Sequence, residues 1–291
     1  MARVAIIGPG AIGGVMAAWL GRTGAHDVTV CARRALENLT VETPTETFST
    51  QPRVVTAPAE APAVDWVLVA TKAYDAESTA AWFSQLTAHG ARVAILQNGV
   101  EHRARFAPYL APEKILPVLV YCPAERSEPG RIRQRRAARL VVEEGGPGRE
   151  FAALFAGTEI AVETTPDFTT ELWRKLCLNA PGALTAILLQ PNGIFRDERI
   201  AAVSRDMMRE CIAVARAEGA ALDDSMIEGT LDIFRKGPAD ILNSLHADRL
   251  AGRRMEIDAR NGAVVRFGRK HGIPTPCNQM VVALLEKLAE G

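Results

Sequence analysis

The stretch Val4-Ala5-Ile6-Ile7-Gly8-Pro9-Gly10-Ala11-Ile12-Gly13 decides the fold, because it joins an apolar strand to a helix through the spacing GxGxxG. The first glycine of such a turn allows a tight bend, the second lets a pyrophosphate approach, and the third allows close helix packing. The N-terminus of the following helix favours the negative charge of phosphate. A chance glycine-rich turn is the alternative. The stretch therefore predicts a dinucleotide site at Gly8, Gly10, Ala11, Ile12 and Gly13.

The end of the second predicted strand indicates which dinucleotide is bound. NAD enzymes place an acidic residue about 20 residues after the glycines, where it binds the ribose 2′-hydroxyl. This sequence has Arg33 and Arg34 there. Two guanidinium groups suit a 2′-phosphate, which they bind through paired hydrogen bonds. We therefore expect NADPH (NADP+) as the cofactor, with Arg33 on its 2′-phosphate; a solvated basic turn is the alternative.

The pattern of apolar residues divides the chain into two domains. Strands are expected at 3–7, 26–31, 65–70 and 92–97 and helices at 11–22 and 78–88, and residues 114–144 add strands around Glu128-Pro129-Gly130. Alternating strands and helices indicate a parallel sheet. Helical spacing dominates later, over 168–189, 197–219, 224–234, 255–271 and 277–289. The sequence predicts an α/β Rossmann-type NADP-binding domain (1–166), followed by an all-α substrate and catalytic domain (167–291).

The composition excludes several classes of protein. The 291 residues are 48% apolar, and 34 basic residues balance 34 acidic ones, so the chain is neither disordered nor attracted as a whole to nucleic acid or membranes. Glycine and proline interrupt the uncharged stretch 4–21, which argues against a targeting or membrane segment. Five isolated cysteines and five histidines without ligand spacing predict no disulfide and no metal site. We expect a cytoplasmic protein.

An arginine cluster in residues 131–139 is the strongest indication of nucleic-acid binding. It contains Arg131, Arg133, Arg135, Arg136 and Arg139. No aromatic residues alternate with these arginines, so we interpret them as the solvated face of two edge strands. No nucleic-acid partner is expected.

Polar residues at two strand ends and on one helix are the candidates for chemistry. Lys72 and Asn98 follow the third and fourth strands, where ligands bind in open α/β sheets. Lys175 and Asn179 lie on an otherwise apolar helix face. A lysine with restricted hydration has a lowered pKa and can donate a proton to a ketone oxygen. The alternatives are an Asn-Gly turn at Asn98 and solvated lysines.

Taken together, five motifs resemble the ketopantoate reductases (2-dehydropantoate 2-reductases). The motifs are Gly8 to Gly13, Thr71-Lys72-Ala73-Tyr74, Gln97-Asn98-Gly99-Val100, Trp173-Arg174-Lys175-Leu176 with Asn179, and Ser244 with Arg254-Met255-Glu256-Ile257-Asp258. The resemblance covers nearly the whole chain. It implies an oxidoreductase acting on CH-OH groups, which uses NADPH to reduce the keto group of 2-dehydropantoate in the pathway to coenzyme A.

The resemblance also implies roles for individual residues. Lys175 matches the catalytic lysine, the general acid. Glu256 matches a catalytic glutamate that helps bind the substrate, and we expect it to orient the substrate and to interact with Lys175. Ser244 matches the position that holds the substrate carboxylate. The remaining matches are Asn179 and Asn192 for substrate, Lys72 for cofactor or substrate, and Asn98 for both. From the residues alone, Glu256 lies on a predicted helix, on a stripe with Gly252, Ala259 and Ala263.

One stretch departs from the family pattern. Asn179-Ala180-Pro181-Gly182-Ala183-Leu184 is one residue shorter and lacks a second asparagine, and Pro181 should kink the helix. A missing polar partner in a site that binds a substrate hydroxyl changes which substrates are accepted, so we expect 2-dehydropantoate or a related 2-keto acid as the substrate. A non-catalytic NADP(H)-binding regulator and a β-hydroxyacid or 6-phosphogluconate type of dehydrogenase are alternatives; the motif 254–258 argues against the second. The sequence does not give the oligomeric state, and a homodimer is one expectation.

Overall fold

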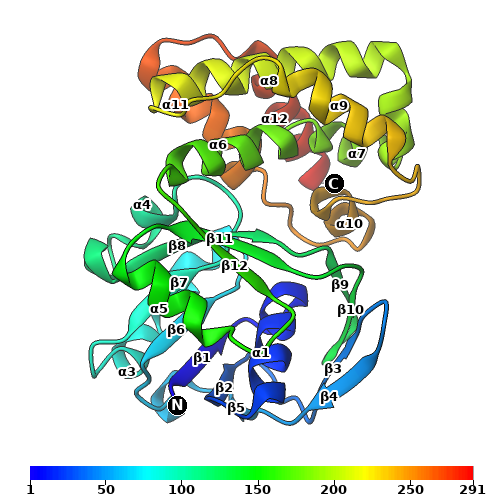
Figure 1. Ribbon diagram of the computed structural model, residues 1–291. Coiled ribbons are helices and arrows are strands. Elements are labelled where there is room, and N and C mark those ends of the chain that lie inside the picture. The colour runs from blue at the N-terminus through cyan, green and yellow to red at the C-terminus, as the bar shows by residue number, and fades with distance from the viewer. Residues whose placement is uncertain (291) are drawn as a thin grey trace. The chain divides into compact units, whose positions relative to one another are not determined.

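The computed structural model describes residues 1–290 and divides into two compact units (Figure 1). Unit 1 comprises Met1–Asn98 and His102–Phe168. Unit 2 comprises Gly99–Glu101 and Thr169–Gly291.

Unit 1 is built on an eight-stranded sheet. Its order is β12-β11-β8-β7-β6-β1-β2-β5. The strands are β1 (Arg3–Ile7), β2 (Asp27–Cys31), β5 (Arg53–Val55), β6 (Trp66–Val69), β7 (Arg92–Ile95), β8 (Ile115–Tyr121), β11 (Arg139–Glu143) and β12 (Ala161–Thr165). All neighbours pair in parallel except β11 and β8, which are antiparallel. The predicted Rossmann-type sheet with added strands is confirmed.

A second sheet of four strands was not predicted. Its order is β4 (Thr47–Thr50), β3 (Leu39–Glu42), β10 (Arg131–Gln134) and β9 (Ala124–Glu128). Of the strands expected after residue 114, only β8 and β11 join the main sheet. Helix α1 (Ala11–Thr23) contacts strands of both sheets (Figure 1). The small sheet forms there because Ile132 is buried beside Gly14, and the buried Gln134 accepts a 3.0 Å hydrogen bond from Trp19 Nε1.

The arginine cluster faces solvent as predicted, but the predicted edge position is wrong. Strand β10 lies inside the small sheet, and β11 lies inside the main sheet. Arg135 pairs with Glu125 at 2.9 Å, and Arg139 pairs with Glu163 at 2.7 Å. Alternation places Ile132 in the core and the flanking arginines outside, so the charges indicate an exposed face rather than an edge.

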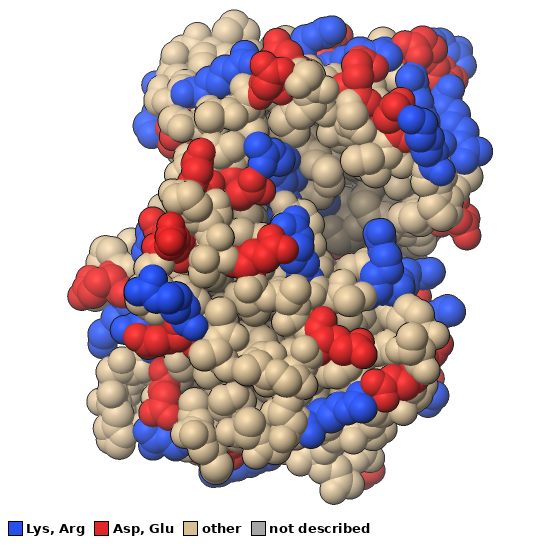
Figure 2. Space-filling view, viewed as in Figure 1, with Lys and Arg blue, Asp and Glu red and all other residues tan. Residues whose placement is uncertain are grey.

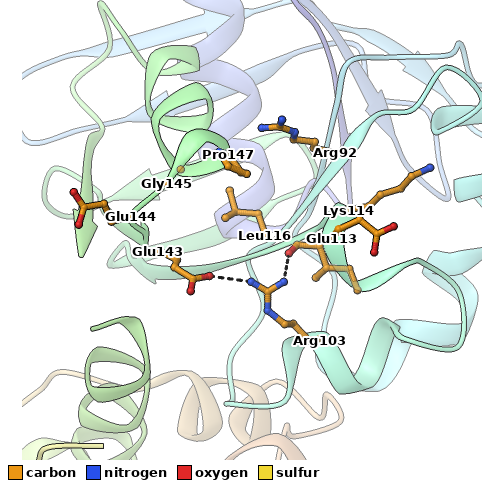
Figure 3. Close-up of a pocket in the computed structure, with 11 residues that line it drawn as sticks. Arg92, Arg103, Glu113, Lys114, Leu116, Glu143, Glu144, Gly145 and Pro147 are labelled. Carbon is orange, nitrogen blue, oxygen red and sulfur yellow. Dashed lines mark hydrogen bonds and ion pairs between the residues drawn. The ribbon is translucent and has the colours of Figure 1, made fainter. Parts of the chain in front are cut away.

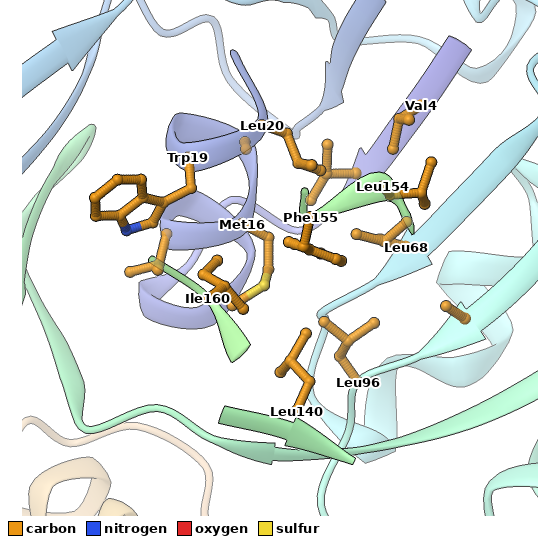
Figure 4. Close-up of a cluster of buried hydrophobic side chains, with 14 of the residues drawn as sticks. Val4, Met16, Trp19, Leu20, Leu68, Leu96, Leu140, Leu154, Phe155 and Ile160 are labelled. Atoms are coloured by element: carbon orange, nitrogen blue, oxygen red, sulfur yellow. The ribbon is translucent and has the colours of Figure 1, made fainter. Parts of the chain in front are cut away.

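Short helices complete unit 1. They are η1 (Pro58–Glu60), η2 (Ala73–Asp75), α2 (Ala76–Ala80), α3 (Phe83–Leu86), α4 (His102–Phe106), η3 (Pro112–Lys114) and α5 (Gly146–Leu154). The helix predicted at 78–88 is two helices, α2 and α3. In the core, Met16 and Leu20 of α1 cluster with Leu68, Leu140 and Phe155 (Figure 4). This apolar layer fixes α1, and with it the glycine turn, against the sheet.

Unit 2 contains helices and no strand within the described residues, as predicted. The helices are α6 (Phe168–Asn179), α7 (Gly182–Leu188), η4 (Asn192–Arg196), α8 (Glu198–Ala217), α9 (Met226–Lys236), α10 (Ser244–Leu250), η5 (Asp258–Gly262), α11 (Ala263–His271) and α12 (Pro276–Ala289). The helix predicted at 168–189 breaks before Gly182, because Pro181 has no N–H to continue it. The helix predicted at 255–271 is wrong at its start, because it begins with the π-helical turn η5.

Charges of both signs are mixed on the visible surface. Lys and Arg are interspersed with Asp and Glu on the face shown in Figure 2. Among residues 1–290, no helix is long and apolar enough to cross a membrane.

Candidate active site

The glycine turn after β1 has the geometry that its sequence predicts. Gly8 has a φ of +88°, and a Cβ there would lie 2.8 Å from Thr71 Cγ2. A Cβ on Gly13 would lie 2.2 Å from the Gly8 carbonyl oxygen. A Cβ on Gly10 would meet no atom within 4 Å. The first and third glycines are therefore required by the fold itself, whereas the second leaves open space beside the turn.

The N-terminus of α1 lies at this open space. Gly10 occupies the N-cap position, so no side-chain hydrogen bond caps the amides of the first turn of α1. That turn also contains no acidic residue. The Gly8 amide donates to the Cys31 carbonyl at 3.1 Å, which ties the turn to the end of β2. Arg33 and Arg34 follow that end, exposed and without an ion pair to any described residue. The positive N-terminal end of α1 and the unpaired guanidinium groups of Arg33 and Arg34 both suit an anionic ligand.

The loops after β6 and β7 are joined by one buried side chain. Gln97 donates from Nε2 to Thr71 Oγ1 at 3.0 Å and to the Lys72 carbonyl at 3.1 Å. Because β1, β6 and β7 are parallel neighbours, these loops follow the same edge of the sheet as the glycine turn. Lys72 and Asn98 are both half-buried. The structure thus brings the predicted unit 1 residues Gly8 and Lys72 to one sheet edge, and Asn98 follows β7 at that edge.

In unit 2, the end of α6 carries two predicted site residues. Lys175 and Asn179 are half-buried, and Leu176 between them is buried. The terminal carbonyls of Asn179 and Ala180 accept hydrogen bonds from side chains of the π-helical turn, Arg260 Nη2 and Asn261 Nδ2. The bond from Arg260 satisfies the Asn179 carbonyl, which the break before Pro181 leaves without a helical partner, whereas the Ala180 carbonyl also accepts from the Ala183 amide at 3.2 Å.

Arg260 connects two of the predicted residues. Its side chain is buried, and Nη1 donates to Ser244 Oγ at 3.3 Å while Nη2 donates to the Asn179 carbonyl. Burial lowers the pKa of Arg260 to about 10, although the charges of Glu256 and Asp248 act in the opposite direction. The guanidinium is therefore still charged at neutral pH. Ser244 itself is exposed and begins α10.

Asn243 fixes the position of Ser244. Its Oδ1 accepts from the amides of Leu245 and His246 at 3.0 and 3.2 Å, which caps α10. Its Nδ2 donates to the Gly182 carbonyl at 2.9 Å and to Thr185 Oγ1 at 2.6 Å. A Cβ on Gly182 would lie 2.9 Å from Asn243 Nδ2 and 3.1 Å from Arg260 Nη2. The small residue at 182 thus admits both side chains beside α7.

Glu256 is buried, but its predicted helical setting is wrong. It lies two residues before η5, and Gly252 lies in a turn with a φ of +61° rather than on the same helix. Ala259 and Ala263 are buried as small packing residues. Glu256 lies in an irregular segment, because the π-helical turn begins only at Asp258. From there its charge acts on Arg260. The predicted interaction between Glu256 and Lys175 stays a prediction.

Asn192 lies in a separate loop of unit 2. Its amide donates to the Ile241 carbonyl at 3.1 Å, and the Gly193 amide donates to the Ala239 carbonyl at 2.8 Å. The side chain is half-buried. Within residues 1–290, no hydrogen bond joins it to the group around Arg260. Its role toward substrate therefore stays a prediction.

Family models match both parts of the chain. Residues 4–147 match the model "Ketopantoate reductase PanE/ApbA", and residues 167–289 match "Ketopantoate reductase PanE/ApbA C terminal". The chain belongs to the ketopantoate reductase family. It is accordingly an oxidoreductase of the 2-dehydropantoate 2-reductase type, as predicted.

Individual relatives extend over the full length. A 2-dehydropantoate 2-reductase of Caulobacter vibrioides is 52% identical over 289 residues, which cover 99% of this chain and 100% of the relative. The structure of a PanE/ApbA family ketopantoate reductase from Ralstonia eutropha superimposes with a TM-score of 0.90 at 35% identity, covering 99% and 98% of the two chains. A 2-dehydropantoate 2-reductase structure from Geobacter metallireducens gives 0.91 at 29% identity, covering 98% and 99%.

Two residues of this ketopantoate reductase family member were missed in the sequence. Arg260 lies four residues after Glu256, and an acid and a base at that spacing often interact. Asn243 directly precedes a helix, a position where asparagine commonly caps the N-terminus. Both patterns are common on protein surfaces, so neither by itself indicates a site.

A pocket elsewhere in unit 1 is distinct from these residues (Figure 3). It has a volume of about 180 Å³ and is lined by charged side chains including Arg92, Arg103 and Glu143. Arg103 pairs with Glu143 at 3.0 Å, and Arg92 pairs with Glu150 at 2.8 Å. No predicted site residue lines it, and Arg92, Arg103 and Glu143 are already paired.

Proposed function

We propose that this protein reduces the keto group of 2-dehydropantoate to the 2-hydroxy acid with NADPH. In this proposal residues 1–166 bind the cofactor and residues 167–291 provide the substrate and catalytic groups. The observation that carries it is the end-to-end match to a 52% identical 2-dehydropantoate 2-reductase, in a chain with an open glycine turn. A fold alone would not support a reaction, but the match extends over 99% of this chain and 100% of a relative with that activity in its name.

The residues of the glycine turn fit a dinucleotide cofactor. The open space at Gly10 and the uncapped N-terminus of α1 support binding of the pyrophosphate. Arg33 would bind the 2′-phosphate, and Lys72 would lie beside the cofactor. NADPH, when bound, supplies the hydride that reduces the keto carbon. Preference for NADPH over NADH follows from the exposed, unpaired arginines after β2 and the absence of an acid there.

The unit 2 residues would hold the substrate and move the proton. We assign Ser244 to the substrate carboxylate, and Asn179 and Asn192 to polar contacts with the substrate. Asn98 of unit 1 would contact both the substrate and the cofactor. Lys175 donates a proton from Nζ to the ketone oxygen as the hydride reaches the carbon, so a C–H and an O–H bond replace the C=O double bond. The half-buried position of Lys175 supports this role, because restricted hydration favours proton release. Glu256 orients the substrate and Lys175.

Turnover assays with a panel of substrates test the proposal. Purified protein is mixed with NADPH and 2-dehydropantoate, and NADPH absorbance is followed beside straight and branched 2-keto acids and an NADH control. We expect fastest turnover of 2-dehydropantoate with NADPH. Turnover of only another acid would keep the reaction and change the substrate. Tight NADPH binding without any turnover would instead support a regulatory protein. Sedimentation measures whether the protein is the predicted homodimer.

A further inference from the structure

The environment of Arg260 is unusual for a buried charge. The residue is 2% exposed, its Nε has no hydrogen-bond partner, and its guanidinium forms no ion pair within residues 1–290. Glu256 and Asp248 act on it only through longer-range electrostatics. Asp248 already pairs with Arg253 at 2.9 Å. A buried cation without a hydrogen-bonded counter-ion is costly, so the fold holds positive charge here that its own carboxylates do not neutralise by contact.

The backbone that carries Arg260 is unusual too. The Gly262 amide donates to the Ile257 carbonyl five residues earlier at 3.0 Å, which makes Asp258–Gly262 a π-helical turn. Such turns are rare and are frequently found at functional sites. The turn places Arg260 and Asn261 next to each other at the end of α6. This arrangement is a second observation, independent of the charge, that marks the position.

Capping of α6 does not by itself explain an arginine. Arg260 Nη2 bonds the Asn179 carbonyl, but the neighbouring Asn261 bonds the Ala180 carbonyl with a neutral amide. A neutral side chain is therefore sufficient for this kind of contact. The cap also uses only one edge of the guanidinium, and Nη1 points to Ser244 Oγ at 3.3 Å. Capping therefore explains neither the positive charge of Arg260 nor its bond to Ser244.

We propose that Arg260 positions Ser244 to bind the carboxylate of the substrate and supplies the positive charge behind it. Nη1 donates to Ser244 Oγ, so the hydroxyl accepts from the arginine and keeps its own proton for the carboxylate. Because Arg260 is buried and Ser244 is exposed, the anion contacts the serine and not the guanidinium. Arg260 is thus a positioning residue, specific for substrates that carry a carboxylate. The inference rests on the proposed assignment of Ser244.

The test compares an acid with its neutral counterpart. Wild type, Arg260→Gln and Arg260→Lys are assayed with NADPH on 2-dehydropantoate and on its lactone, which keeps the keto group but has no carboxylate. We expect Arg260→Gln to raise the KM for the acid about 10- to 100-fold, the usual effect of a lost hydrogen bond to a charged group. Arg260→Lys keeps the positive charge, so its KM for the acid should lie between those of wild type and Arg260→Gln. The KM for the lactone should change less than about threefold. An equal effect on both compounds would overturn the proposal.

Arg249→Gln is the matched control. Arg249 donates to the Ala186 and Ile187 carbonyls at the end of α7, as Arg260 does at the end of α6, but it has no bond to Ser244. Both glutamine variants should lower the Tm, because each loses a cap. Only Arg260→Gln should raise the KM selectively for the acid. The same selective rise in Arg249→Gln would show a general effect of losing a cap.

A double-mutant cycle and a binding measurement cover the remaining outcomes. In a Ser244→Ala background, Arg260→Gln should raise the KM for the acid less than about threefold, because the Ser244 hydroxyl through which Arg260 acts on the substrate is already absent. Fully multiplicative effects would contradict the proposal. Stabilisation by (R)-pantoate, measured as a shift in Tm with NADP+ present, needs no turnover and should be large in wild type and small in Arg260→Gln. Equal shifts in Tm for wild type and Arg260→Gln would also contradict the proposed role of Arg260. Failure of the proposed reaction would be seen separately, as an absence of turnover by wild type.

Discussion

The glycine turn of unit 1 and the Arg260 group of unit 2 are built in opposite ways. The turn consists of six consecutive residues, and its shape follows from missing Cβ atoms at Gly8 and Gly13. The Arg260 group joins Asn179, Ser244 and a π-helical turn that are far apart in sequence. The first is local backbone geometry, and the second is an assembly of distant side chains. A candidate cofactor site can thus be predicted from one short motif, whereas the side-chain contacts of the candidate substrate site are visible only in the folded chain.

Lys175→Ala should have the largest effect of any single change in unit 2. We expect kcat to fall about 100- to 10,000-fold, because no other group takes over proton donation to the ketone oxygen. The Kd for NADPH, measured by fluorescence titration, should stay within a factor of about three, because the cofactor residues are in unit 1. Lys236→Ala, which removes an exposed lysine paired with Asp232, is the control. Normal turnover by Lys175→Ala would remove the lysine from the mechanism.

Two alanine substitutions separate the roles of the glycines. Gly10→Ala should leave the Tm unchanged, since its Cβ meets no protein atom, but should weaken NADPH binding about 10- to 100-fold by occupying the phosphate space. Gly13→Ala should destabilise the fold by about 3 kcal/mol, because its Cβ would overlap the Gly8 carbonyl. Urea unfolding and calorimetric titration measure both. Tight NADPH binding by Gly10→Ala would place the phosphates elsewhere.

Arg33→Ala tests which nicotinamide cofactor the turn selects. The KM for NADPH should rise about tenfold or more, because a charge-assisted bond to the 2′-phosphate is lost. The KM for NADH should not change. Arg131→Ala, an exposed arginine of β10, serves as the control in the same steady-state assay. Equal changes for the two cofactors would show that Arg33 does not select the phosphate.

Glu218→Gln should have the smallest effect and lies outside both regions of the comparison. Burial alone would raise the pKa of Glu218, but hydrogen bonds from His271 and Lys270 outweigh it, so the pKa is below the ordinary value. The carboxylate therefore stabilises the fold above the ordinary carboxyl pKa, and this contribution is lost as pH falls through the lowered one. The variant should be less stable by under about 1 kcal/mol at neutral pH. In urea unfolding at several pH values, the difference should vanish in acid, and a constant difference would refute the assignment.

The sequence was sufficient at two places where the structure depends on neighbouring residues. Residues 3–13 gave the strand, the turn and the helix start, and Pro181 gave the break after α6, because both depend on local backbone chemistry. The small sheet was missed, because β3 and β10 pair across almost 90 residues of chain and no turn links them. Arg260 was missed for the same reason. Its partner carbonyl on Asn179 is 81 residues away, and a single extra residue in a π-helical turn determines where it points.

The most direct test of this division is a crossed measurement on two arginine variants. The KM for NADPH and the KM for 2-dehydropantoate are determined side by side for wild type, Arg33→Ala and Arg260→Gln. We predict that Arg33→Ala raises only the KM for NADPH and that Arg260→Gln raises only the KM for 2-dehydropantoate. If either variant raised both constants equally, or if wild type did not turn over 2-dehydropantoate with NADPH, the proposed division between cofactor and substrate residues would be wrong.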